Sequence, residues 1–197
     1  MDRIIVPVDF SADSLKGLDF ALLVSRNERV KIQMVYVQKT AEDYRPGSME
    51  EEYHFAENQM KKLVSQYAER LGEGSKLDYI IKKGKIYREV VEQAESFKNS
   101  LICASTHGAS GFEEFFIGSN AFKIISATAN PVITLRKNPP EKVSKIVVPL
   151  KLQVDTRQKL PFSADLAEVF GAEIHLVSLS VTRNKKDNNR LHAYLDQ

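Results

Sequence analysis

Two glycines and a serine between residues 104 and 120 have the residue types and spacing of a phosphate-binding loop. Gly108 follows an apolar run, nine residues separate it from Gly118, and Ser119 comes next, where an amphipathic run begins. Glycine lets the backbone approach a ligand closely, and the free N–H groups at a helix start attract phosphate. We therefore expect a phosphate site here. The alternative is an ordinary glycine-containing loop with Ser119 as a helix cap.

Other catalytic and metal-binding patterns are weaker. The sequence lacks both the Gly-x-x-x-x-Gly-Lys-Ser/Thr pattern of P-loop NTPases and a Gly-x-Gly-x-x-Gly after the first strand. Cys103 and His107 lie four residues apart on a strand-to-loop segment, which does not align them as a thiol–imidazole pair. We therefore expect Cys103 to be a core residue. Asp9, Ser11 and His107 lack the nucleophile elbow of a hydrolase. The four histidines have no metal-ligand spacing.

Composition limits the classes of function. The chain has 197 residues, enough for one full domain and part of another, and its net charge of +2 gives no drive toward nucleic acid or anionic membranes. One cysteine excludes an internal disulfide and fits a reducing compartment. No apolar run approaches the roughly 20 residues that span a bilayer, and no signal peptide precedes the first strand. We expect a cytoplasmic protein without nucleic-acid or membrane partners.

The elements that must position the loop alternate along the chain. Apolar runs predict strands, and 3.6-residue periodicity predicts helices, with Ser11 as the cap of the first helix and Ile86, Val90, Val91 and Ala94 facing inward in the third. The expected strands are 4–8, 30–37, 77–81, 101–104 and 131–136, and the expected helices are 15–22, 49–71, 86–97 and 118–127, with a loop at 41–48.

This alternation predicts an α/β fold, an open parallel five-stranded sheet with helices on both faces, as in Rossmann-like domains. Ligands of such sheets bind beyond the carboxyl ends of the strands, near the switch point. Asp9, Val37 and the loop after Ser105 should therefore share one edge of the sheet.

The second part of the chain repeats the first at a constant offset of 142 positions. Ile4 returns as Ile146 and Pro7 as Pro149 without a gap. The repeat predicts a strand, a helix and a second strand, and then lacks a counterpart of the remaining elements. Lys151 stands where Asp9 stands in the first copy, so a second site of the same kind is not expected. The expected organisation is a domain at 1–137, a linker at 138–144 and an incomplete βαβ domain at 145–197.

The segment Thr106–Asn120, together with Pro131–Arg136, resembles the closing half of a universal stress protein domain. Ile4–Ser11 is similar to that family's first strand and turn, and 146–180 resembles the first third of a tandem domain. Members that bind ATP carry Gly-x-x-Gly, nine residues, and then Gly-Ser or Gly-Thr. Gly108, Gly118 and Ser119 match this pattern, whereas Ser105 occupies the first glycine position.

The resemblance implies an adenine nucleotide α-hydrolase-like fold that binds ATP or a related adenine nucleotide, with Mg²⁺ as an optional companion. Asp9 would bind the ribose region, Val37 the adenine, and the residues around Gly118 the phosphates. No catalytic or metal-binding residue is implied, and at most slow ATP hydrolysis is expected. The implied nucleotide-binding residues are Pro7, Val8, Asp9, Val37, Ala104, Ser105, His107, Gly108, Gly118, Ser119 and Asn120.

The resemblance also implies a role in stress response or signalling, exerted through conformation or dimerisation. The last strand of such domains commonly pairs with a twofold mate, so we expect a homodimer through 131–136, the 145–180 repeat, or both. The alternative is an interaction protein of the same fold that binds no nucleotide. Ser105 and the pair Glu113-Glu114, which follows the second glycine, favour this alternative.

Overall fold

The chain forms two compact units, residues Met1–Pro140 and Glu141–Gln197. The structure, a computed structural model, describes residues 1–38, 48–106, 118–150 and 157–178. The boundary between the units falls within the segment 138–144 that the sequence suggested as a linker. The loop expected at 41–48 lies outside the described residues, apart from Ser48.

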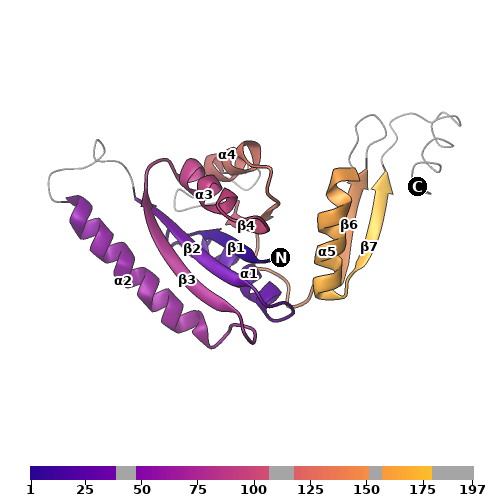
Figure 1. Ribbon diagram of the computed structural model, residues 1–197, viewed down its shortest axis with the longest axis horizontal. Coiled ribbons are helices and arrows are strands. Elements are labelled where there is room, and N and C mark those ends of the chain that lie inside the picture. The colour runs from indigo at the N-terminus through magenta and orange to yellow at the C-terminus, as the bar shows by residue number, and fades with distance from the viewer. Residues whose placement is uncertain (39–47, 107–117, 151–156, 179–197) are drawn as a thin grey trace, which may run out of the picture. The chain divides into compact units, whose positions relative to one another are not determined.

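The first unit is built on a five-stranded parallel sheet, which confirms the predicted fold class (Figure 1). Its strand order is β3-β2-β1-β4-β5. Since β2 and β3 extend the sheet on one side of β1 while β4 and β5 extend it on the other, the switch point lies between β1 and β4. The strands are β1 Arg3–Pro7, β2 Lys31–Gln38, β3 Lys76–Lys83, β4 Ser100–Ser105 and β5 Val132–Leu135.

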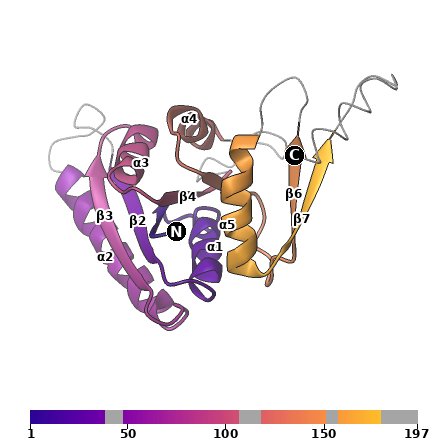
Figure 2. The ribbon, with the colours of Figure 1, turned by 45° about the vertical axis from the view of Figure 1, so that its right-hand side comes forward.

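Helices cover both faces of this sheet. Figures 1 and 2 show α1 and α2 on one face and α3 and α4 on the other. The central strand β1 is sealed between the two layers, with Ile4, Ile5 and Val6 fully buried. Burial on both faces explains why its sequence is continuously apolar rather than alternating. The helices are α1 Leu15–Ser25, α2 Ser48–Ala68, α3 Ile86–Glu95 and α4 Ser119–Ala127.

Two glycines set how closely elements approach. A Cβ on Gly17 of α1 would lie 2.5 Å from the carbonyl oxygen of Cys103, so α1 contacts the backbone of β4 directly. A Cβ on Gly72 would lie 1.6 Å from the carbonyl oxygen of Ser25. The turn after α2 therefore docks on the end of α1, and α2 ends at Ala68 rather than near residue 71.

Ser11 is not the cap of α1, contrary to the sequence expectation. The helix begins at Leu15, and the N–H of Ser14 donates to the Ser11 hydroxyl at 3.1 Å in the turn that precedes it. The Ser11 hydroxyl also donates to Asp9, so this serine serves the turn after β1. The chain needs these residues to turn away from the sheet before a helix can start.

The second unit is a strand, a helix and a strand, with β6 and β7 parallel. Ile146 pairs with Ile174 in this sheet, as Ile4 pairs with Ile32 in the first unit. The two registers coincide at the offset of 142, and the repeat itself stays a prediction. The elements are β6 Lys145–Leu150, a short 3-10 helix Arg157–Lys159, α5 Leu160–Phe170 and β7 Glu173–Ser178.

Candidate functional site

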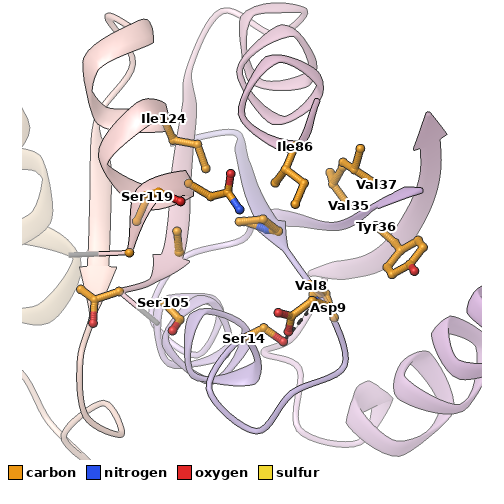
Figure 3. Close-up of a pocket in the computed structure, with 16 residues that line it drawn as sticks. Val8, Asp9, Ser14, Val35, Tyr36, Val37, Ile86, Ser105, Ser119 and Ile124 are labelled. Atoms are coloured by element: carbon orange, nitrogen blue, oxygen red, sulfur yellow. Dashed lines mark hydrogen bonds between the residues drawn. The ribbon is translucent and has the colours of Figure 1, made fainter. Parts of the chain in front are cut away.

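A cavity of about 440 Å³ lies at the carboxyl ends of β1, β2 and β4, at the switch point of the sheet (Figure 3). It brings together nine residues that the sequence singled out, whereas His107 and Gly108 lie outside the described residues. Sequence reasoning had not included the other lining residues. The full lining is Pro7, Val8, Asp9, Ser14, Val35, Tyr36, Val37, Ile86, Ala104, Ser105, Thr106, Gly118, Ser119, Asn120, Ala121 and Ile124.

A hydrogen-bonded turn holds Asp9 in place. Its carboxylate accepts the Ser11 N–H at 3.0 Å and the Ser11 hydroxyl at 2.5 Å. Its own N–H donates to the Ser14 hydroxyl at 3.3 Å (Figure 3). Ser14 is almost fully buried, so this side of the turn is anchored to the domain. The carboxylate retains further lone pairs with which it can accept hydroxyl groups of a ligand.

Phe10 is the strained residue of this turn. Its φ of 65° lies in the left-handed region, which residues with a side chain seldom adopt. Its ring stacks on Tyr36 at a centroid distance of 4.9 Å and meets the edge of Phe55 at 6.0 Å. These aromatic contacts hold the turn in its strained conformation, which persists only when the surroundings enforce it.

Tyr36 links the cavity to α2. Its hydroxyl donates to Glu52 at 2.5 Å. Burial raises the pKa of Tyr36, and the hydrogen bond to Glu52 and the negative charges of Glu52 and Asp9 raise it further. The phenol is therefore neutral at physiological pH, and its proton stays in the bond to α2.

One side of the cavity is apolar. Val35 is almost fully buried beneath it, and Val37 packs against the core cluster that includes Val35. Ile86 was expected to face the core, but it is 38% exposed. It occupies the first position of α3 and borders the cavity on the same side as Val35 and Val37 (Figure 3). These side chains form a surface suited to the face of a planar ring.

The opposite side of the cavity is polar and lies at the start of α4. Gly118 is the cap residue of this helix and Ser119 its first helical residue, so the alternative of Ser119 as the cap is wrong. The N–H of Gly118 donates to the carbonyl oxygen of Thr106 at 2.6 Å. The next N–H groups, from Ser119 onward, have no acceptor within the helix. They are the backbone donors that an anion at this end of the cavity would find.

The described lining of the cavity carries little charge. Asp9 is the one charged side chain among the described lining residues. Among the residues that the structure describes, no group of three or more His, Cys, Asp or Glu side chains could hold a metal ion. Cys103 is fully buried in the core, as expected, and burial raises the pKa of its thiol, so it is no nucleophile.

Most of the lining residues that sequence reasoning missed fall into two groups. Val35, Tyr36 and Thr106 are chain neighbours of predicted site residues, so an extension along each strand end would have found them. Ile86 and Ile124 belong to α3 and α4, and the helical pattern had indicated a core position for Ile86. Only the packing of these helices over the sheet brings them to the cavity.

None of the helices in the described ranges is long and apolar enough to cross a membrane.

Comparisons with known proteins found similar sequences for the first unit. The model of the universal stress protein family matches residues 1–136. Universal stress protein MJ0531 of Methanocaldococcus jannaschii is 28% identical over 149 residues, which cover 68% of this chain and 82% of that protein.

Solved structures show the same fold. The structure of a universal stress protein from Archaeoglobus fulgidus matches with a TM-score of 0.75 at 17% identity, and the match covers 99% of this chain and 72% of that one. A universal stress protein in complex with cAMP matches with a TM-score of 0.51 at 17% identity, over 68% of this chain and 97% of that one. The family match over most of the chain, together with this fold, shows that the chain belongs to the universal stress protein family.

Proposed function

We propose that the first unit binds an adenine nucleotide in the cavity at the switch point and acts in stress response or signalling through the bound state. The observation that carries this proposal is the convergence of Asp9, Val37, Ser105 and Ser119 on one cavity. They come from three separate strand ends and a helix start, which only the fold brings together. A binding role fits a site whose described residues include no paired nucleophile and base.

The base would lie on the apolar side of the cavity. Val35, Val37 and Ile86 supply a surface that removes the face of a purine from water. In Figure 3 Asp9 lies below both this side and Ser119, beside Val8 and Ser14. It would accept hydrogen bonds from the ribose hydroxyls while Ser11 keeps its carboxylate oriented.

The phosphates would lie at the start of α4, where Ser119 and Asn120 border the cavity. Unpaired N–H groups and the helix dipole favour negative charge at this place. We propose ATP or a related adenine nucleotide as the ligand. The described carboxylate, Asp9, is engaged with Ser11 and does not make a dedicated Mg²⁺ site, so the nucleotide's own phosphates would hold that ion.

Two further facts support the proposal. The chain belongs to the universal stress protein family, and a structural neighbour of the same family was solved in complex with cAMP. We propose that hydrolysis is slow or absent, because no described residue near Ser119 could serve as a general base for an attacking water.

Equilibrium dialysis with labelled ATP tests the proposal. We expect saturable binding that Gly118→Val abolishes, since a branched side chain would enter the cavity at the cap of α4. The backbone of Gly118 has φ −54° and ψ 146°, which other residues adopt, so the variant should fold. Val147→Ala in the second unit is the control. Absence of saturable binding at millimolar ATP, AMP and cAMP would refute the proposal.

A second candidate function is an interaction protein that uses this fold without nucleotide. Ser105 favours it, because its side chain borders the cavity where ATP-binding members have a glycine. In that case Gly118→Val would leave the protein's assembly and partners unchanged. Ser105→Gly discriminates further, because it should strengthen nucleotide binding only if the cavity is a nucleotide site.

We propose homodimerisation as the mode of assembly. In the described sheet β5 pairs with β4 along one edge and has no strand on its other edge, and its four residues are partly exposed. An open edge of this kind pairs readily with a second strand. Sedimentation equilibrium tests this, with Thr134→Pro as the variant that removes a backbone donor from the edge. A monomeric wild-type protein at high concentration would contradict it.

A further inference from the structure

Basic side chains gather around Tyr87, where α3 and α4 begin. Lys85 is the cap residue of α3, Arg88 lies in its first turn, and Lys123 lies about one turn into α4. The Nε of Arg88 donates to the Tyr87 hydroxyl oxygen at 3.1 Å. The Nζ of Lys123 lies 5.9 Å from the centroid of the Tyr87 ring. Two cations from two helices therefore lie close to one phenol, and Lys85 precedes it by two positions in the chain.

These cations have no anionic partner in the described part of the chain. No ion pair between described residues includes Lys85, Arg88 or Lys123. Two carboxylates of α3, Glu89 and Glu92, point elsewhere and pair with Lys82 at 3.2 and 3.8 Å. The described residues therefore leave the positive charge around Tyr87 uncompensated.

The position of the cations adds to this imbalance. The start of a helix carries a partial positive charge, so a lysine cap and an arginine in the first turn are unfavourable there. Most helices place acidic residues at this end for the same reason. An anion bound between the two helix starts would offset both the dipoles and the side-chain charges.

Tyr87 supplies a directed hydrogen-bond donor. Its ring packs against the hydrophobic core, which fixes its position. Because its oxygen accepts the Arg88 N–H, its own O–H can donate to a ligand. The pKa of Tyr87 is lowered, first by the hydrogen bond from Arg88 and then by the charges of Arg88, Lys85 and Lys123. A surface that favours the phenolate favours other anions at the same place.

The cluster adjoins the cavity of the proposed nucleotide site. Ile86, which lies between Lys85 and Tyr87 in the chain, borders that cavity (Figure 3). Ser119 and Asn120 border it from the first turn of α4, four and three positions before Lys123. The cluster and the cavity therefore share the starts of both helices.

We propose that Lys85, Tyr87, Arg88 and Lys123 form a phosphate-binding site. Its ligand is a phosphate chain, either the terminal phosphates of the nucleotide in the cavity or a free inorganic polyphosphate. Lysine and arginine bind phosphate as charges, and arginine also offers paired donors. The first source rests on the proposed function, whereas the second is independent of it.

The test compares two double variants of the full chain with the same net charge. Arg88→Gln/Lys123→Gln removes the two cations measured against Tyr87, and Arg26→Gln/Lys98→Gln is the matched control. Arg26 follows the end of α1 and Lys98 follows α3, and both are exposed away from the cavity lining. Isothermal titration with adenosine, ATP and tripolyphosphate then gives three affinities for each protein.

If the cluster holds the nucleotide's phosphates, the first variant binds ATP about tenfold more weakly than the control, because each exposed charge contact contributes modestly. Adenosine affinity stays unchanged. If the ligand is a free polyphosphate, tripolyphosphate affinity falls while ATP affinity does not. Equal affinities of both double variants for ATP and for tripolyphosphate overturn the inference. Failure of every adenine ligand to bind the wild-type protein refutes the proposed function. The tripolyphosphate titration alone then tests whether the cluster binds phosphate.

Discussion

Each of the two units contains a strand–helix–strand segment, and the two segments lie in very different surroundings. In the first unit Ile5 and Val35 are almost fully buried, at 0% and 1% exposed. Their counterparts at the offset of 142, Val147 and Val177, are 62% and 40% exposed. In the first unit α3 and α4 cover this face of the strands. An apolar strand pattern thus becomes a core only when a second helical layer covers it.

The comparison also explains why the cavity belongs to the first unit. A cavity at a switch point needs strands on both sides of β1, and helix starts to close it. The first unit supplies these through β4, α3 and α4, which come after the repeated segment. The repeated segment by itself carries the Asp9 turn in one copy and Lys151 in the other.

Truncating a buried side chain of the first unit and its exposed counterpart in the second should give the largest difference in the free energy of unfolding. Ile5→Ala should lower the free energy of unfolding of the first unit by about 3 kcal/mol, because it leaves a cavity in a packed core. Val147→Ala, at the counterpart position, should cost under about 0.5 kcal/mol, since its side chain is largely in water. Urea denaturation of both variants measures this. Similar losses would show that the open face of β6 and β7 is covered in solution.

The close approach of α1 to the sheet should be the next most sensitive feature. Gly17→Ala should cost about 2 kcal/mol, because the added Cβ must displace the backbone at Cys103. The counterpart of Gly17 is Lys159, which is exposed in the short helix before α5. Lys159→Ala should leave the thermal midpoint almost unchanged. A tolerated Gly17→Ala would mean that α1 can move away from β4 without loss.

Nucleotide binding should be confined to the first unit. We expect a stoichiometry of one nucleotide per chain in calorimetric titration. Asp9→Asn should weaken binding about tenfold, since the amide keeps an acceptor for Ser11 but loses the charge that strengthens hydrogen bonds to the ligand. Asp165→Asn, on the exposed face of α5, is the control. Two bound nucleotides per chain would contradict the asymmetry of the two units.

The smallest expected effect concerns the link between β2 and α2. Tyr36→Phe should cost about 1 kcal/mol, the value of one hydrogen bond. Because the folded-state pKa of Tyr36 is raised, its contribution is complete below the unfolded pKa of about 10 and is lost as pH rises above it. The wild-type protein should therefore lose more stability than Tyr36→Phe between pH 9 and pH 11, a range set about that unfolded value. Circular dichroism melts across this range test it, and parallel pH profiles would disprove it.

Several features of the site could be predicted from the sequence because they follow from chain order. Strand ends carry Asp9, Val37 and Ser105, and the rule for parallel sheets places strand ends at one edge. The Gly118-Ser119 pair predicted the start of a helix, because of its residue types. By contrast, Ile86 looked like a core residue, because helical periodicity identifies an apolar face but not what that face meets.

The basic cluster around Tyr87 shows the same limit. Arg88 and Lys123 are 35 positions apart in the chain, and nothing in either local pattern connects them. Their common neighbour becomes visible only when α3 and α4 pack side by side. The strain at Phe10 also escaped the sequence, because its φ depends on aromatic partners in β2 and α2.

The sequence by itself determined the order of the elements, the parallel sheet, the family and the offset of the repeat. These properties reside in local periodicity and in motifs of adjacent residues, which a linear chain carries without its fold. The tertiary structure decided which apolar residues are buried, which border the cavity and which charges gather at the two helix starts. These features depend on the packing of segments that are far apart in the chain. The burial of a residue and its charged neighbours are set by its surroundings rather than by the residue itself.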